Sequence, residues 1–320
     1  MWSLQLRLWI LWAVMFSLVY ALLAIVARVM GISNFTFYVS LGVGILFFQY
    51  LIGPKMVEIT MGVRYVSEAE APDLHAMVGE LARKAGIPKP KVGVSPMEIP
   101  NAFAFGRGVS DGRMCVTQGI VRTLNKEELR AVLGHEISHL KNRDVLTITM
   151  ISVIPLLFWY LANYLMWGGG RNRDNSSGNL ALFGFLAFLM YFVSNFIVLF
   201  ASRLREYYAD RGSVELGCPP YHLASALYKL VYGTAKLPKR QIEAAEGAKA
   251  FFVTDPSRAY NEIRELKSVD TDFSGSIDAS ELAALRSKEP KLGAADKMME
   301  IMSTHPNMLK RIKQLSEYVR

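Results

Sequence analysis

The sequence predicts a mainly α-helical integral membrane protein with four transmembrane helices and a soluble, largely helical domain that contains a small β-sheet. Three observations indicate this fold class. Hydrophobic residues make up 52% of the chain, which exceeds the share typical of soluble proteins. Four uncharged stretches are each about 20 residues long, enough for a helix to cross the hydrocarbon core. The remaining segments show the periodicity of amphipathic helices and short strands.

The uncharged stretches divide the chain into two membrane hairpins and two soluble parts. The stretches are residues 8–27, 35–53, 145–167 and 180–201. The first is too long for the apolar region of a signal peptide and lacks a small-residue cleavage site. Pro155, Asn163 and Asn195 indicate that the later two stretches partly face protein. We therefore expect an N-terminal transmembrane hairpin, the first part of a soluble domain, a second transmembrane hairpin and the second part of the domain at 1–53, 54–143, 144–202 and 203–320.

Flanking basic residues predict the orientation of the chain. The larger set lies on one side of the expected membrane and comprises Arg7, Lys55, Arg64, Lys141, Arg143, Arg203 and Arg205, against Arg28, Arg171 and Arg173 on the other. This asymmetry places both soluble parts and both termini in the cytoplasm of a multi-pass protein of the cell membrane, inner or plasma. The net charge of +8 is scattered, which favours a lipid bilayer over nucleic acid as a partner. Cys115 and Cys218 form no CxxC motif, as expected for a reducing compartment.

The first soluble part shows clear boundaries for helices and strands. The predicted elements are, in order, a helix in 70–88 that ends at Gly86, a strand at 90–94, a β-hairpin over 101–117 and a helix over 126–142. Asn125 and Glu128 have the spacing of a capping box at the start of the last helix.

That helix carries the sequence LGHEISHLKNRD, in which His135 and His139 are four residues apart. Residues at this spacing share one face of a helix, so both imidazoles can bind one metal ion. Glu136 is rotated by roughly 100° from His135, a position from which it can take a proton from a zinc-bound water. The alternative is a charged helix face with two solvated histidines.

Two histidines are too few for catalytic zinc, which takes three protein ligands and a water. Glu206 in SRLREYYAD is the best candidate for the third ligand, because it follows the fourth apolar stretch and returns to the membrane face where His139 lies. Asp210, one turn later, could hold the second nitrogen of a ligand histidine. The alternative is an ordinary pair on a helix surface.

Four motifs in this order resemble the HtpX-type membrane zinc metallopeptidases, relatives of the CAAX prenyl endopeptidases: PNAFAFG, AVLGHEISHLKNRD, SRLREYYAD and STHP. The resemblance covers nearly the whole chain. It implies a zincin-like (gluzincin) catalytic domain, one Zn²⁺ held by His135, His139 and Glu206, and Glu136 as the general base. It also implies that cleavage takes place on the cytoplasmic side and removes misfolded or damaged membrane proteins, as in protein quality control and stress responses.

The resemblance further implies two roles outside the zinc ligands. Asn101, Ala102, Phe103 and Ala104 would form a strand edge that binds the substrate, and His305 would help to stabilise the transition state. From the residues alone, 101–104 could equally be a structural hairpin, and His305-Pro306 could cap or break a helix.

A second metal motif lies at residues 270–281 and departs from the family pattern. The segment DTDFSGSIDASE fits the twelve-residue EF-hand loop, with Gly275 at the sharp turn. The candidate Ca²⁺ ligands are Asp270, Asp272, Ser274, the carbonyl of Ser276, Asp278 and Glu281. The alternative is an acidic turn between helices.

The sequence is therefore interpreted as a membrane-bound zinc endopeptidase that acts on protein substrates. Two alternatives remain open: a non-proteolytic protein with a structural zinc site, and a calcium-sensing membrane adaptor. A prenyl-protein protease is a narrower alternative, although four spans leave no large enclosed chamber. The natural substrates and the oligomeric state do not follow from the residues.

Overall fold

The structure is a computed structural model that describes residues 35–167, 177–238, 242, 252–254, 258–266, 268–287 and 293–319. The chain divides into two compact units: Met1–Ile52 with Thr147–Ala201, and Gly53–Leu146 with Ser202–Arg320. Each unit joins segments that are distant in the sequence. All of the predicted metal ligands belong to the second unit.

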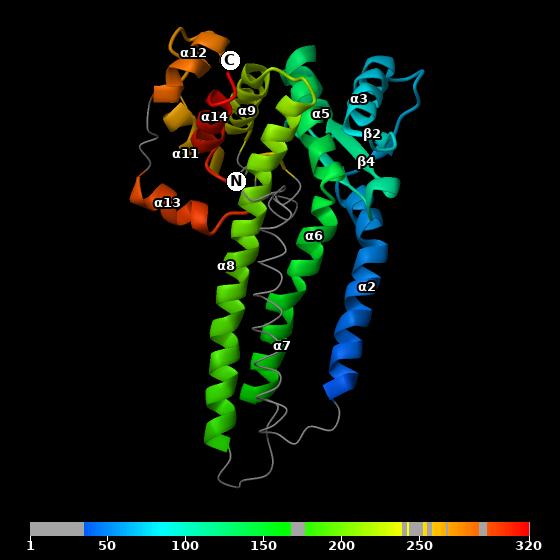
Figure 1. Cartoon of the computed structure of the whole chain (residues 1–320), viewed down its shortest axis with the longest axis vertical. Helices are drawn as coiled ribbons and strands as arrows, with labels where there is room; N and C mark the ends of the chain where they lie inside the picture. Colours follow the sequence, from blue (N-terminus) through cyan, green and yellow to red (C-terminus); the bar gives the residue numbers. More distant parts are fainter. Residues whose placement is uncertain are drawn as a thin grey trace. The chain divides into compact units, whose positions relative to one another are not determined.

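The first unit is helical wherever the structure describes it (Figure 1). Its residues come from helices α2 (Phe35–Thr60), α6 (Asp144–Ile151), α7 (Val153–Trp167) and α8 (Ser177–Glu215). Two helical segments among the described residues are long and apolar enough to cross a membrane, Asp144–Asn163 and Ala181–Glu215. Helix α2, which contains the expected span 35–53, is not one of them, and the expected span 8–27 lies outside the described residues. The predicted total of four spans is therefore not confirmed.

The expected stretch 145–167 is interrupted rather than continuous. Helix α6 ends at Ile151 and α7 begins at Val153. Pro155 explains the break, because it has no N–H to donate to the carbonyl of Ile151. Ser152 at the junction donates a side-chain hydrogen bond to the carbonyl of Ile148 at 2.8 Å.

The second unit contains a four-stranded mixed sheet. The strands are β1 (Arg64–Tyr65), β2 (Lys91–Ser95), β3 (Ala102–Phe105) and β4 (Arg113–Thr117), in the order β1-β2-β4-β3. β2 and β4 are parallel, whereas β3 and β4 form the predicted antiparallel hairpin around a short 3₁₀ helix, η1 (Val109–Asp111). This order leaves β3 at one edge of the sheet.

Helices make up most of the second unit. Alongside α5 (Lys126–Lys141) they are α3 (Pro72–Ala85), α4 (Gln118–Thr123), α9 (Pro220–Ala235), α11 (Ala259–Leu266), α12 (Ala279–Ala284), η4 (Leu285–Ser287), α13 (Ala294–Ile301) and α14 (Met308–Ser316). Helix α3 ends at Gly86, as predicted, because this residue adopts a left-handed conformation with φ of 70°. Helix α9 packs against α5, α11 and α14 (Figure 1), and its Leu223, Leu227 and Leu230 are fully buried. The core around α9 thus joins the HExxH helix to the C-terminal helices.

Candidate metal centre

Helix α5 carries both histidines of the HExxH motif on one face. The helix starts as predicted, because the side chain of Asn125 accepts a hydrogen bond from the N–H of Glu128 and the Glu128 side chain accepts one from the N–H of Asn125. His135 and His139 follow one turn apart. Their Nε2 atoms lie 3.1 Å from each other, with the two rings edge to face.

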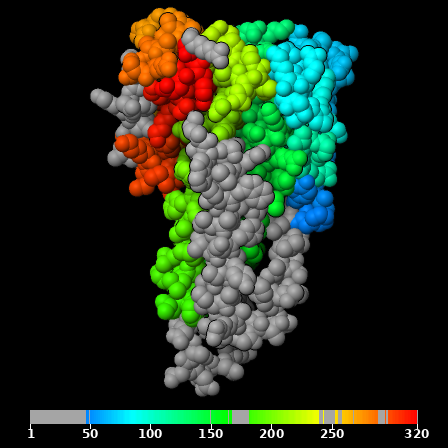
Figure 2. Space-filling model, viewed as in Figure 1, coloured from blue at the N-terminus to red at the C-terminus, as the bar shows by residue number. Residues whose placement is uncertain are grey.

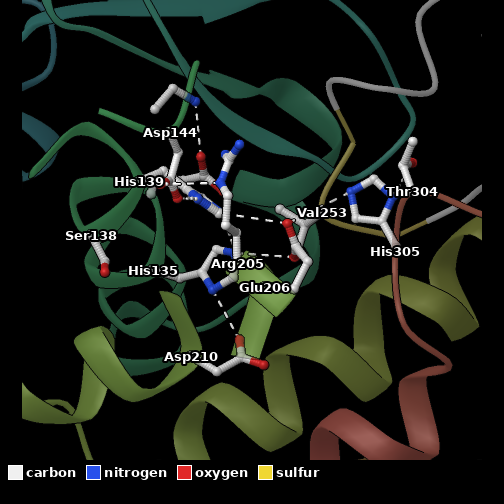
Figure 3. Close-up of polar contacts among 12 residues, drawn as sticks. His135, Ser138, His139, Asp144, Arg205, Glu206, Asp210, Val253, Thr304 and His305 are labelled. Atoms are coloured by element: carbon white, nitrogen blue, oxygen red, sulfur yellow. Dashed lines mark hydrogen bonds and ion pairs between the residues drawn. The ribbon is translucent and has the colours of Figure 1, made fainter. Parts of the chain in front are cut away.

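Helix α8 brings Glu206 to the same place (Figure 3). The Oε2 atom of Glu206 lies 3.5 Å from His135 Nε2, and its Oε1 atom lies 3.5 Å from His139 Nε2. Helices α5 and α8 can approach this closely because residue 212 is glycine, and a Cβ atom on Gly212 would overlap the side chain of Ser138. The structure thus brings together the three residues that the sequence suggested as ligands.

The spacing of these three ligand atoms fits a zinc ion. Zinc binds imidazole nitrogen and carboxylate oxygen at about 2.0–2.2 Å in a tetrahedron, so neighbouring ligand atoms lie roughly 3.3–3.6 Å apart. The two Nε2 atoms are 3.1 Å apart, and each lies 3.5 Å from one of the two Glu206 oxygens, which are separations close to that edge length. Two imidazoles and one carboxylate are also a donor set of catalytic zinc, which keeps its fourth position open.

A buried carboxylate holds the outer nitrogen of each histidine. The Asp210 Oδ1 atom lies 2.9 Å from His135 Nδ1, in the position that the sequence suggested. The Asp144 Oδ2 atom lies 2.6 Å from His139 Nδ1. Such contacts fix the ring orientation and leave Nε2 free for a metal. The sequence interpretation missed Asp144. Its position five residues after His139, at the first residue of α6, could have suggested this contact.

Two arginines hold these carboxylates in turn, and the sequence interpretation assigned neither of them to the site. Arg311 on α14 is fully buried and donates from Nε and Nη2 to Asp210 at 2.9 and 2.7 Å, while its Nη1 lies 3.0 Å from Glu206 Oε2. Arg205 Nε lies 3.1 Å from Asp144 Oδ1. Burial alone would lower the pKa of Arg311, but Asp210 and Glu206 raise it, so this side chain remains a cation.

The charges around the centre call for a divalent cation. Four carboxylates, those of Glu136, Asp144, Glu206 and Asp210, lie at this centre, and the guanidinium groups of Arg205 and Arg311 contact the last three of them. This group of six side chains carries two excess negative charges when all are ionised. A Zn²⁺ ion would neutralise them, and in its absence a proton on His135 does so in part.

The protonation of His135 shows this compensation. Burial alone would lower the pKa of His135, but hydrogen bonds to Asp210 and Glu206 raise it to about 10. The metal-free protein therefore holds a proton on this imidazole at neutral pH. A metal ion must displace that proton before it can bind Nε2.

We expect the apparent zinc affinity of the metal-free protein to rise with pH. Release of one proton on binding makes the affinity about tenfold higher per pH unit below the pKa of His135. Competition with a chromophoric chelator between pH 6 and 8 measures this slope. Asp210→Asn should give a shallower slope, because it removes the charge that raises the pKa of His135. Equal slopes in the two proteins would contradict this explanation.

Glu136 lies beside the candidate ligands and contacts the edge strand. Its carboxylate is within 4.8 Å of ligand nitrogens of both histidines, and its Oε2 atom accepts a hydrogen bond from the N–H of Ala104 at 2.8 Å. Burial raises the pKa of Glu136 above its usual range. A carboxylate with a raised pKa is a stronger base near neutral pH.

The predicted substrate segment contacts the site through the backbone of Ala104. Ala104 lies in edge strand β3 and directs its N–H away from β4, toward Glu136. Ala102 and Phe103 are buried. Asn101 is fully buried and its Oδ1 accepts a hydrogen bond from the N–H of Val253 at 2.9 Å. The Asn101 side chain thus supports the segment 252–254.

His305 lies next to the three candidate ligands (Figure 3). Its Nε2 atom is 3.9 Å from Glu206 Oε1, and its Nδ1 atom is 3.0 Å from the hydroxyl of Thr304. The ring is buried, and the chain that carries it runs directly into Asn307, the N-cap of α14. His305 therefore lies within reach of a reacting group at the metal, and Pro306 does lie just before a helix.

The EF-hand-like loop forms a second group of converging carboxylates. Ligand oxygens of Asp270, Asp272 and Glu281 lie within 4.8 Å of one another. Asp270 and Glu281 are buried, whereas Asp272 is exposed. Gly275 has a φ of 76° at the predicted sharp turn. The loop lies between α11 and α12, so it is separate from the candidate zinc ligands in the sequence.

Comparisons with known proteins agree with the geometry of the HExxH site. The sequence model of Peptidase family M48 matches residues 68–319. The Protease HtpX homolog of Methanothermobacter thermautotrophicus is 52% identical over 246 residues, which are 77% of this chain and 93% of the relative. That of Moorella thermoacetica is 41% identical over 223 residues, 68% of this chain and 74% of the relative. The crystal structure of S. mikatae Ste24p shares the fold, with a TM-score of 0.54 at 16% identity over 97% of this chain and 67% of that one.

Proposed function

The chain belongs to peptidase family M48 and is a membrane zinc metalloprotease, and from this premise we propose that it cleaves misfolded or damaged membrane proteins on the cytoplasmic side. The observation that carries this proposal is the close approach of His135 Nε2, His139 Nε2 and the Glu206 carboxylate, which has one oxygen near each imidazole. We assign these three residues as ligands of one zinc ion per chain in a gluzincin-like site. Asp210 and Asp144 orient the two histidines.

The proposed mechanism gives Glu136 the role of proton carrier. Bound zinc supplies Lewis-acid chemistry, acidifying water and polarising the scissile carbonyl. Glu136 accepts the proton of the attacking water and delivers it to the leaving amine. His305 is placed to donate a hydrogen bond to the oxyanion that develops on the substrate. Arg311 holds Glu206 and Asp210 in position throughout.

The proposed substrate groove follows the free edge of β3. An extended peptide that paired there would be read through its main chain, which explains how one site accepts many sequences. Ala104 is the residue whose N–H faces the site, at present donating to Glu136. Ala102 and Phe103 belong to the same edge strand, and the buried Asn101 directly precedes it.

We further propose a multi-pass topology with both termini and both soluble parts in the cytoplasm. The two apolar helical segments of the described chain and the excess of Lys and Arg on one side support this orientation. In this topology the membrane hairpins are 1–53 and 144–202, and the catalytic parts are 54–143 and 203–320. The protein is then integral to the lipid bilayer.

The experiment that tests the function is cleavage of casein, as an unfolded protein, by the detergent-purified enzyme. Wild-type protein loaded with zinc should cut casein, lose activity with a chelator and regain it when zinc is restored. If the zinc-loaded protein does not cut casein, the result supports the alternative of a non-proteolytic protein with a structural zinc site. If replacing Asp270 and Glu281 impairs cells more than replacing Glu136 does, the result supports the calcium-sensing adaptor.

A second metal site, for Ca²⁺, is proposed at the loop 270–281. Among the residues that the structure describes, Asp270, Asp272, Asp278 and Glu281 form no ion pair with a basic side chain. Buried carboxylates are normally paired with a cation or bound to a metal. Asp270 instead accepts a hydrogen bond from the hydroxyl of Tyr228 on α9 at 3.0 Å. The convergence of oxygens of Asp270, Asp272 and Glu281 within 4.8 Å of one another is the observation that favours calcium over an ordinary acidic turn.

We expect Ca²⁺ to bind this loop with a dissociation constant of roughly 10⁻⁵–10⁻³ M, the range of single or weak EF-hand sites. Tyr228 offers a readout, because its ring next to Asp270 can sensitise luminescence of a Tb³⁺ ion in the loop. Calcium should displace the Tb³⁺ signal, and Glu281→Gln should abolish it. Glu317→Gln, which changes an exposed carboxylate on the segment after α14, is the matched control. An unchanged signal in Glu281→Gln would refute the site.

A further inference from the structure

Helix α13 has its apolar and acidic faces reversed relative to a helix in water. Its exposed apolar side chains are Met298, Ile301 and Met299, which are 64%, 47% and 36% exposed, and Met302 at its C-cap is 63% exposed. Its Glu300 is buried, with its carboxylate accepting hydrogen bonds from Asn307 N–H and from Lys310 Nζ at 3.3 and 2.5 Å. A helix facing water places the charged residue outward and the apolar residues inward.

The exposed residues form one continuous stripe. Met298 is three residues before Ile301 and four before Met302, so these side chains are neighbours on the helix surface. Figure 2 shows the segment in orange-red at the molecular surface. Lys297 is exposed beside the stripe. An apolar stripe next to a basic residue is the pattern of helices that lie in a membrane interface.

Arg203 fixes the end of α13 to a defined point on helix α8. Its Nη1 atom donates to the carbonyls of Glu300, Ile301 and Ser303 at 3.0, 2.9 and 2.7 Å. These carbonyls lie at and just after the C-terminus of α13, where a helix leaves carbonyls without partners. Arg203 is the first charged residue after the uncharged stretch 180–201 of α8. The C-terminus of α13 is therefore held by a residue that comes two positions after the uncharged stretch of α8 in the sequence.

We propose that α13 lies in the membrane–water interface, with Met298, Ile301 and Met302 in contact with the lipid acyl chains. This inference rests on the proposed function, because it takes the apolar part of α8 as a membrane span. Lys297 would reach the lipid headgroups. The segment Ser303–His305 follows α13 directly, so the bilayer surface holds His305 at a fixed depth. Substrate segments that leave the membrane would then meet the proposed substrate groove at the interface.

Spin labels in vesicles test this inference. The inactive Glu136→Gln protein carries one added cysteine, and Cys115 and Cys218 are buried and therefore protected from the label. The sites are Met298→Cys, Phe273→Cys as an exposed control on the calcium loop, and Phe200→Cys on α8 as a control for the span. The labelled proteins are reconstituted in vesicles of phosphatidylcholine and phosphatidylglycerol. The collision rate of each spin label with oxygen, which enters the lipid, is compared with its collision rate with a nickel complex that stays in water.

The expected result is a ratio of oxygen to nickel accessibility at residue 298 that is several-fold higher than at residue 273. A label at 298 that is as exposed to nickel as the one at 273, while the label at 200 is lipid-exposed, overturns the proposal for α13 alone. Nickel access at 200 would instead show that the proposed span fails. If the label at 298 is protected from the nickel complex only when casein is added, the stripe is a protein-binding surface, which also overturns the lipid assignment.

Discussion

Replacing Glu136 with glutamine is expected to lower the rate of casein cleavage by about 10²–10⁴-fold while about one zinc ion per chain is retained. Glutamine has nearly the same shape and its side-chain oxygen can still accept the hydrogen bond from Ala104. It cannot accept a proton from the attacking water. The change therefore removes the base and leaves the three candidate ligands in place.

The matched control for this variant is Glu127→Gln, which changes an exposed carboxylate in the first turn of the same helix. It should cut at nearly the wild-type rate. Burial raises the pKa of Glu136, so the active carboxylate form should be lost as pH falls through a value above the usual 4.5. The acid limb of the wild-type pH–rate profile measures this. Full activity in Glu136→Gln would exclude Glu136 as the base.

Replacing Arg311 with methionine is expected to lower the free energy of unfolding by about 3–5 kcal/mol. The guanidinium is fully buried and contacts both Asp210 and Glu206, and without it only the proton on His135 would compensate these two buried charges. Zinc affinity should fall as well, because Asp210 would no longer be fixed against His135. Thermal and urea unfolding of the zinc-free protein in detergent measures the first effect.

A control and a second variant identify the cause of this loss. Arg286→Met removes an exposed arginine that lies 3.6 Å from Glu317, and it should cost at most about 1 kcal/mol. Adding Asp210→Asn to Arg311→Met should recover part of the stability, because it removes one uncompensated charge. Asp210→Asn alone gives a reference value for the loss in the free energy of unfolding. If Asp210→Asn destabilises the Arg311→Met protein by that same amount, the two residues do not act as a pair.

Local sequence patterns were sufficient to predict the elements that carry the site. The capping box fixes the start of α5, and the four-residue spacing places His135 and His139 on one face. The hairpin around Asp111 and Gly112 was predicted from its turn residues. Each of these features depends on interactions between residues that are close in the sequence.

Contacts between distant segments could not be predicted in the same way. Arg311 and Asp210 are separated by 101 residues, and only the packing of α14 on the rest of the second unit brings them together. Arg205 was read as a flanking charge, although it pairs with Asp144 inside the site. The resemblance gives Asn101 a substrate role, and the hydrogen bond of its side chain with Val253, 152 residues away, was not predicted. The reversed faces of α13 were not recognised, since a short helix with several methionines also fits a core position.

The zinc content of the detergent-purified protein tests the central claim most directly. It should be measured in wild type, in Glu206→Gln, and in Glu215→Gln as a control on the exposed face of the same helix. The ligand assignment predicts about one zinc per chain in wild type and in Glu215→Gln after dialysis against a weak chelator, and its loss in folded Glu206→Gln. Wild-type protein without zinc, or Glu206→Gln that retains zinc as tightly as wild type, would contradict it.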